Sequence, residues 1–396
     1  MAADLTERAH YRTLADVRNI LDLEKSQLRH RFSRALRNFL PNPPPAQPNS
    51  SSSSLQGEVV KQYEKRNNLT WKERLEFFEF GFFTLNLGTG ACTILIGNIS
   101  FHFPAKQYIG YVFLALNCII YLTNLTLLAL KAWWHPAAFR RSFVVPGSAL
   151  FFPTTILAFA TIYMSFIIFV HPHVTSPVFI DVMYVLFWIY VAMSVFCAAL
   201  LQWTMYDQAI PQDRDFETIT PSECLPVFPM MLAGAVGSTL ANIVEDRRAI
   251  PLIMLSYAFQ GCGFLTAQLK LSAWMSRNVL FGHPHDTRAV PIFFMSVGPP
   301  GFTAIAFLNL GQRALEVFPR FGVLQLPLLL PNNNAGEMVF VASWLTALCV
   351  WGQCFWFILA TSVIWVQSLL RADKPIGWGM AWFATTFPLG ASLSSR

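Results

Sequence analysis

The sequence predicts an all-α integral membrane protein in which helical hairpins surround a central pore. Only 13% of the 396 residues are charged and 54% are hydrophobic, whereas a soluble domain has about 25% charged residues. The mean hydropathy is +0.44. Apolar runs long enough to cross a bilayer recur from residue 79 onward, and proline or glycine interrupts every second run.

The charges lie mostly near the N-terminus, where 13 of the 28 Lys and Arg residues precede residue 75. Residues 1–76 are predicted to form a basic cytoplasmic arm with a disordered Pro/Ser-rich linker at 43–55, and residues 77–396 a transmembrane transporter domain. No basic patch alternates with aromatic residues, so we expect no nucleic-acid partner. No Walker lysine motif or catalytic constellation occurs, so we do not expect an enzyme.

A spanning helix needs about 20 apolar residues. We expect a ninth span to begin near residue 377. Before it, we expect full spans at 79–99, 108–131, 146–170, 178–201, 222–244, 250–271, 290–310 and 338–369. Basic residues are more frequent in the loops on the same side of the membrane as the N-terminus, which predicts a multi-pass protein with its N-terminus in the cytoplasm.

Helix breakers fall on the odd-numbered spans, and the even-numbered spans are largely smooth. A proline frees a carbonyl, which inside a bilayer must find a partner in protein or in a watery cavity. We therefore expect the odd spans to line the pore and the even spans to form an outer belt. The alternative is that proline and glycine are simply common in membrane helices. The breakers are Gly88, Gly90, Pro153, Pro226, Pro229, Gly298, Pro299, Pro300 and Pro388.

The predicted path is neutral. Thr89, Thr154 and Thr386 offer hydroxyls on the odd spans, and ionisable residues are nearly absent from the span cores. Such a path with basic mouths suits a small anion, which gains hydrogen bonds without meeting a carboxylate. Arg140 and Arg141 could attract anions at a cytoplasmic mouth, or they could serve only as a topology signal.

We expect neither a metal nor a cofactor. His171 and His173, like His283 and His285, lie in short proline-containing loops, where histidine is a common polar residue. The seven cysteines are scattered singly, whereas a metal site needs clustered ligands. Buried apolar positions explain them better.

Several short motifs occur in order along the spans. Together they resemble the tellurite-resistance/dicarboxylate transporter family (the voltage-dependent anion channel superfamily), and in particular its fungal malic acid transport branch. The matching stretches are Leu87–Gly90, His135-Pro136, Phe152–Thr154, Leu225–Pro229, Phe259–Gly261, Val297–Phe302 and Phe387-Pro388.

The resemblance implies ten helices in five hairpins, with the odd helices lining a pore that a phenylalanine closes. By position this gate is Phe387, although a Phe that merely packs is the alternative. The implied substrates are small organic anions, most of all C4-dicarboxylates such as malate, moving with or without protons. Sulfite efflux and passive anion conduction remain alternatives, and the family also implies a homotrimer as one assembly. The resemblance to this transporter family implies the plasma membrane as the location.

The sequence departs from the family pattern at its C-terminal end. It stops in the ninth helix, so we expect either a fragment that lacks the tenth helix or a shortened protein. An inactive, truncated membrane protein is therefore a third interpretation of its function.

Overall fold

Within the described residues of the computed structural model, eight helices are long and apolar enough to cross a membrane. The structure describes residues 70–99, 101, 103–144, 146–207, 216, 219–282, 290–323, 335–371 and 382–394. The predicted arm up to residue 69, its linker at 43–55 and the loop histidines 283 and 285 lie outside these residues. All eight predicted full spans are confirmed: Phe80–Asn98, Lys106–Trp134, Gly147–Phe169, Pro177–Gln202, Pro221–Ala241, Asp246–Phe281, Val290–Phe321 and Ala335–Ser368.

Two spans run about ten residues further than predicted. The sixth continues to Phe281 and the seventh to Phe321. Both extensions carry arginines, which ended the apolar runs in the sequence. The structure accommodates these charges near the helix ends: Arg277 donates to Gly282 O (2.6 Å), and Arg313 pairs with Asp246 (2.8 Å).

Odd and even spans differ sharply in burial. In spans one, three, five and seven, 50, 67, 89 and 78% of the most apolar window is buried, against 17, 33, 33 and 33% in spans two, four, six and eight. The prediction that interrupted spans lie inside and smooth spans outside is therefore confirmed.

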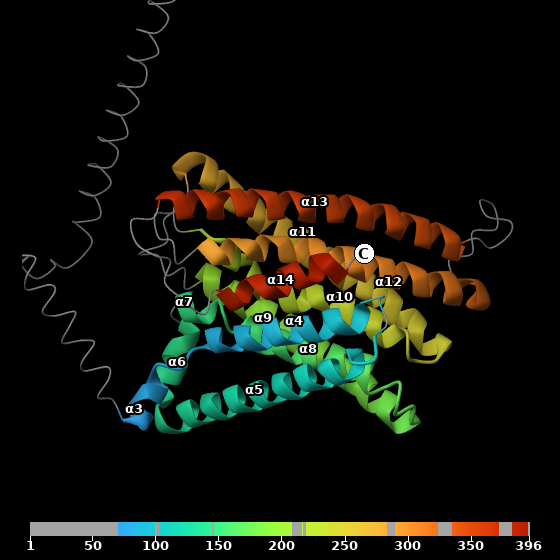
Figure 1. Ribbon diagram of the computed structural model, residues 1–396, viewed down its shortest axis with the longest axis horizontal. Helices are drawn as coiled ribbons and strands as arrows, with labels where there is room; N and C mark the ends of the chain where they lie inside the picture. The colour runs from blue at the N-terminus through green and yellow to red at the C-terminus, as the bar shows by residue number, and fades with distance from the viewer. Residues whose placement is uncertain are drawn as a thin grey trace, which may run out of the picture. The chain divides into compact units, whose positions relative to one another are not determined.

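The inner helices form a closed ring. They are α4 (Thr84–Asn98), α8 (Pro153–Phe169), α10 (Phe228–Ala241), α12 (Gly298–Phe321) and α14 (Phe383–Ser394). In this order each contacts the next, and α14 contacts α4, so that the blue and red helices lie side by side in Figure 1. The helical hairpins thus surround a common centre.

Each outer helix covers the groove between two inner helices. They are α5 (Lys106–Trp134), α9 (Pro177–Asp207), α11 (Asp246–Phe281) and α13 (Ala335–Arg371). For example, α5 contacts α4 and α8, and α11 contacts α10 and α12. Large apolar side chains such as Val112 and Leu345 remain exposed on these outer helices, as expected for a face in lipid.

Three inner helices follow a short 3₁₀ segment. These segments are η1 (Phe80–Phe83), η3 (Pro221–Val227) and η4 (Val290–Val297), which precede α4, α10 and α12. A turn at residues 150–152, after α7 (Pro146–Ala149), precedes α8. Each interruption therefore lies where irregular backbone passes into an α-helix.

The breakers act differently from our expectation. Pro153, Pro229, Pro299 and Pro300 lie in the first turn of their α-helices, where the missing N–H has no intrahelical partner to lose. They begin helices rather than kink them. Helix α4 is continuous through Gly88 and Gly90, so those glycines mark no kink. Pro226 lies within η3 and Pro388 within α14, so only Pro388 is interior to an α-helix among the predicted breakers.

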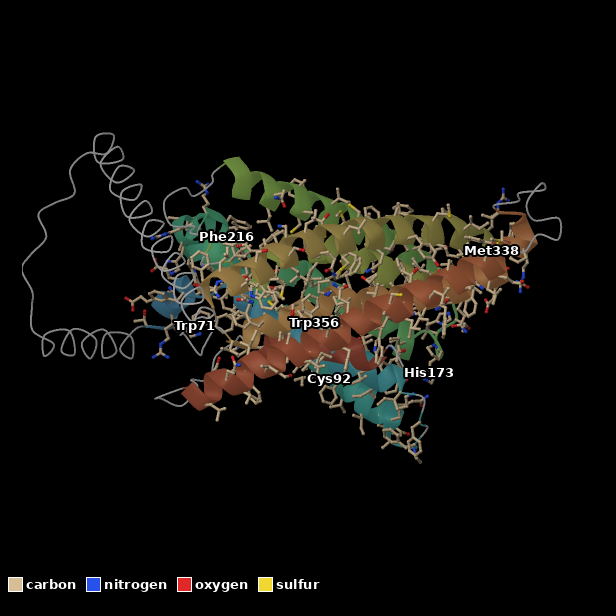
Figure 2. The ribbon with its side chains drawn as sticks, turned by 90° about the horizontal axis from the view of Figure 1, so that it is seen from above. Trp71, Cys92, His173, Phe216, Met338 and Trp356 are labelled. Atoms are coloured by element: carbon tan, nitrogen blue, oxygen red, sulfur yellow. The ribbon has the colours of Figure 1, made fainter. Side chains whose placement is uncertain are left out.

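The described part of the N-terminal region is held against the first hairpin. Helix α3 (Trp71–Glu76) places the Trp71 ring edge-on to Trp134, with the ring centroids 5.8 Å apart. Lys72 Nζ lies 5.1 Å from the centre of the Trp134 ring, a cation–π contact. Trp71 and Phe216 lie at one end of the bundle, called here the α3 end, and His173 and Met338 lie at the other, the His173 end (Figure 2). Helix α6 (Pro136–Val144) follows α5 at the α3 end (Figure 1).

A buried amide network joins α4, α5 and α8. Asn117 Oδ1 accepts hydrogen bonds from Asn86 Nδ2 (2.8 Å) and Thr89 Oγ1 (3.0 Å), and Asn117 Nδ2 donates to Thr161 Oγ1 (3.3 Å). Asn124 Nδ2 donates to Asn86 Oδ1 (3.0 Å). Because lipid offers no competing partners, such bonds fix one helix against the next.

Candidate functional site

Two phenylalanines from neighbouring inner helices pack against each other, and a third lies beside the start of α12. The rings of Phe302 on α12 and Phe387 on α14 lie 4.5 Å apart at 36°, and both side chains are buried. A Cβ at Gly298 would lie 3.5 Å from the Phe228 ring and 3.8 Å from Pro388 Cβ. We call Phe228, Phe302 and Phe387 the aromatic plug.

Gly88 brings α4 close to α14. A Cβ at Gly88 would lie 2.7 Å from Thr386 Oγ1 and 3.7 Å from Phe383 O, so only glycine permits this approach without a shift. Thr386 Oγ1 donates to Phe383 O at 2.9 Å. The sequence-predicted residues Gly88, Gly298, Thr386, Phe387 and Pro388 are therefore brought together by the structure.

Other predicted residues lie elsewhere. Thr154 Oγ1 donates to Phe80 O (3.0 Å) and Phe151 O (2.6 Å), which places Pro153 and Thr154 with η1 rather than with the aromatic plug. Thr89 hydrogen-bonds toward α5 through Asn117, so the lining role of its hydroxyl stays a prediction.

The predicted mouth residues Arg140 and Arg141 are exposed on α6. Two lysines of the outer helices reach backbone in or beside the 3₁₀ segments. Lys131 is buried, and its Nζ donates to Phe78 O (2.7 Å) and Ser142 Oγ (2.8 Å). Lys270 Nζ donates to Glu223 O within η3 (3.0 Å).

These lysines belong to a wider pattern, because each outer helix donates to a carbonyl in or beside an interruption. From α5, Asn124 donates to Phe82 O (3.3 Å). From α9, Tyr190 Oη donates to Pro229 O (2.6 Å). From α13, Cys354 Sγ donates to Val297 O (3.7 Å). Each outer helix is thus bonded to backbone in or beside an interruption of an inner span.

The centre of the ring carries no fixed charge on the described inner helices. Of these, α4, α8, α10 and α14 contain no Asp, Glu, Lys, Arg or His, and α12 has none before Arg313. At the His173 end Arg313 pairs with Asp246 (2.8 Å) and Glu316 (2.8 Å), and Arg320 pairs with Asp246 (2.6 Å). That cluster is therefore close to neutral.

The N-terminal turns of α10 and α12 lie next to the aromatic plug. Phe228 is the first residue of α10 and Gly298 the first of α12, and a Cβ on Gly298 would contact the Phe228 ring. The N-terminal turn of an α-helix carries partial positive charge, which suits an anion. Here Pro229, Pro299 and Pro300 bring no N–H to these turns, and the Phe228 N–H donates to Leu225 O, so the attraction rests on the helix dipole. Within the described residues no group of three His, Cys, Asp or Glu side chains could hold a metal ion.

Sequence reasoning missed Phe228 and Phe302 as partners of Phe387, and it missed the outer-helix donors. One signal was available for part of the plug. A Phe-Pro step recurs at the inner helices, at 152–153, 228–229 and 387–388. Phe302 is not followed by a proline. Donors such as Tyr190 lie in apolar runs without proline or glycine, where the sequence does not distinguish them from other residues.

Replacing Gly90 with Ala should destabilise the fold. The new Cβ would lie 2.3 Å from Thr161 Oγ1 and 2.5 Å from Thr161 Cβ, so α4 and α8 must separate. Overpacking of this kind costs about 1–3 kcal/mol. Gly261→Ala is the matched control, because no atom lies within 4 Å of its Cβ. Thermal unfolding in detergent should show a lower Tm for Gly90→Ala only; equal Tm values in both variants would contradict the close approach.

Known proteins show the same organisation in their sequences. Residues 77–395 match the voltage-dependent anion channel family. A malic acid transport protein of Schizosaccharomyces pombe is 24% identical over 84% of this chain and 72% of its own length. A sulfite efflux pump of Trichophyton rubrum is 29% identical over 79% of each chain. An uncharacterized transporter of Methanocaldococcus jannaschii is 20% identical over 80% of this chain and 83% of its own.

The family match covers well over half of the chain and contains the inner ring, the outer belt and the aromatic plug. The relatives that are named for an activity are transport proteins. The ring of broken helices with an uncharged centre thus belongs to a multi-pass protein of the voltage-dependent anion channel family.

Proposed function

We propose that this protein moves small organic anions, above all C4-dicarboxylates such as malate, along the centre of the inner ring. The observation that carries the proposal is the uncharged centre, where the first turns of α10 and α12 adjoin the aromatic plug. An anion there would gain helix-dipole attraction without meeting a carboxylate.

The hydrogen bonds between inner-helix carbonyls and outer helices favour anions over cations. A cation path needs oxygen atoms on its wall, as in carbonyl-lined filters. Here Pro229 O bonds to Tyr190, and Val297 O to Cys354, on the outer helices. Oxygen atoms held in this way repel a passing anion less than carbonyls that point inward.

Phe387 is the proposed gate, and Phe302 is its partner. Two buried rings 4.5 Å apart leave little room between α12 and α14, and an apolar constriction excludes hydrated ions. Pro388 directly follows Phe387 inside α14, so the helix lacks one backbone hydrogen bond where the gate would move.

Malate is the first candidate substrate and sulfite the second. The Gly298-Pro299-Pro300 element resembles the malate branch, and a malic acid transport protein is among the relatives. The sulfite efflux pump has the higher identity, 29% against 24%. This higher identity is the observation that supports sulfite as the second candidate substrate.

We propose that any coupled proton travels on the substrate. The described inner helices carry no titratable carboxyl or imidazole before Arg313, so they offer no group to relay a proton. A dicarboxylate that enters as its monoanion would bring the proton with it. The proposed setting is the plasma membrane with the α3 end in the cytoplasm, where Arg140 and Arg141 would face the mouth, and a homotrimer is the proposed assembly.

Transport by the full chain in proteoliposomes tests the proposal. Labelled malate uptake should be faster at about pH 3.5 than at about pH 6, because carboxyl groups are more fully protonated at the lower pH. Equal uptake at both pH values would contradict the proposal that a proton enters with the substrate. Sulfite flux without malate uptake would favour the second candidate, and no flux of either anion would reject both.

Truncating the gate should open the path. Phe387→Ala removes one of the two facing rings, so we expect a severalfold rise in anion leak through reconstituted protein, measured as current or as efflux. Phe355→Ala is the control, because Phe355 is exposed on α13, away from the ring. Unchanged leak in Phe387→Ala would reduce Phe387 to an ordinary packed side chain.

Removing the hydroxyl that donates to an inner-helix carbonyl should weaken substrate binding. Tyr190→Phe deletes the hydroxyl that bonds Pro229 O, and a hydrogen bond worth ~1 kcal/mol corresponds to about a fivefold rise in KM. Tyr163→Phe is the matched control, because its buried hydroxyl donates to Met183 O on outer helix α9 (2.8 Å). If both variants shift KM alike, the direction of the Pro229 carbonyl does not affect the anion.

A further inference from the structure

A cavity of about 530 Å³ lies at the His173 end, apart from the inner ring's centre. It is formed where α4 and α8 end and α5 begins. His173, one of its lining residues, is labelled at this end in Figure 2. The lining residues are Gly97, Phe103, Pro104, Lys106, Gln107, Tyr111, Ile168, Phe169, Pro172 and His173.

Three polar side chains of this lining have hydrogen-bonding capacity to spare. An ammonium carries three N–H donors, and Lys106 Nζ uses one of them on Ile99 O (2.6 Å). Within the described residues, the Gln107 amide and the His173 ring nitrogens make no hydrogen bond, and Lys106 has no carboxylate partner. Lys106 and His173 bring positive or proton-donating groups, and the lining contains no Asp or Glu.

The floor of the cavity separates it from the path. A Cβ at Gly110 would lie 2.1 Å from the Phe169 ring, and one at Gly97 would lie 2.4 Å from Ile168 Cγ2. Tyr111 Oη donates to Phe169 O at 3.2 Å and ties α5 to the end of α8. Helices α4, α5 and α8 are therefore pressed together beneath the cavity, and a ligand must enter from outside the bundle.

The cavity lies at the boundary of the spans. Span one ends at Asn98, span two begins at Lys106 and span three ends at Phe169. This level corresponds to the headgroup layer or the adjoining water. Helix α5 begins at Lys106, so its N-terminal turn adds partial positive charge beside the ammonium. Phe103 and Phe169 complete an apolar wall next to these polar groups.

We propose that this cavity binds an oxyanion group, a phosphate or carboxylate, held by Lys106, Gln107 and His173. The group belongs either to an anionic phospholipid at the headgroup layer or to a soluble anion from the adjoining water. The site is separate from the transport path and does not depend on the proposed function. Charge-assisted hydrogen bonds from Lys106 supply most of the attraction, and Gln107 and His173 orient the oxygens.

Binding is tested with the full chain in nanodiscs of phosphatidylcholine. One arm adds dioleoylphosphatidate to the nanodisc lipid, a second adds sodium phosphate to the buffer, and a third adds sodium malate. The readout is the dependence of Tm on ligand amount, which gives an apparent Kd. A response to phosphatidate alone assigns a lipid headgroup, and a response to phosphate, or one to malate that Lys106→Gln removes, assigns a soluble anion.

The variants connect the response to this cavity. Lys106→Gln should weaken apparent binding about tenfold or more, as expected for the loss of a charge-assisted bond. Arg247→Gln is the control, because Arg247 is an exposed cation at the first turn of α11, outside the lining. If Lys106→Gln does not fold, the double variant Gln107→Leu/His173→Leu replaces it, since neither side chain bonds to the described protein. No response in any arm, or an equal loss in Arg247→Gln, would overturn the proposal.

Discussion

The constraint on which this fold depends is that a backbone carbonyl in the membrane must be given a donor. The 3₁₀ segments hold their backbone by weaker hydrogen bonds, and Pro226 leaves Glu223 O without its i+3 N–H donor. Outer helices donate to this backbone and to the helix starts that follow it: Asn124 and Lys131 from α5, Tyr190 from α9, Lys270 from α11 and Cys354 from α13. The belt therefore does more than shield the ring from lipid. It stabilises the interrupted ring, whose described helices carry no charge before Arg313.

The sequence predicts which spans form the inner ring and which form the outer belt, because contact with lipid constrains the residues of each span directly. Span lengths follow from hydropathy, and the inner position of the odd spans follows from where proline and glycine fall. The function of each breaker could not be predicted in the same way. The sequence does not distinguish a proline that begins a helix, such as Pro229, from one that lies inside a helix, such as Pro388. Gly88 reads as a kink, yet it permits contact with Thr386 on a helix far away in the sequence.

The candidate site shows the same limit. Phe387 was reached through a resemblance, and its partner Phe302 depends on the register between α12 and α14, which no local pattern contains. The substrate is harder still. Relatives named for malate and for sulfite share this sequence over most of its length. An uncharged centre accepts either anion in principle, so selectivity must depend on the size and position of a few side chains.

The two ends of the inner ring differ in stiffness. At the His173 end, Arg313 binds Asp246 and the carbonyls of Ala241 and Val244, and Arg320 binds the same Asp246. These hydrogen bonds join α10, α11 and α12. At the α3 end the corresponding helices enter through 3₁₀ backbone, whose hydrogen bonds are weaker. We therefore expect the inner helices to deform more easily at the α3 end than at the His173 end.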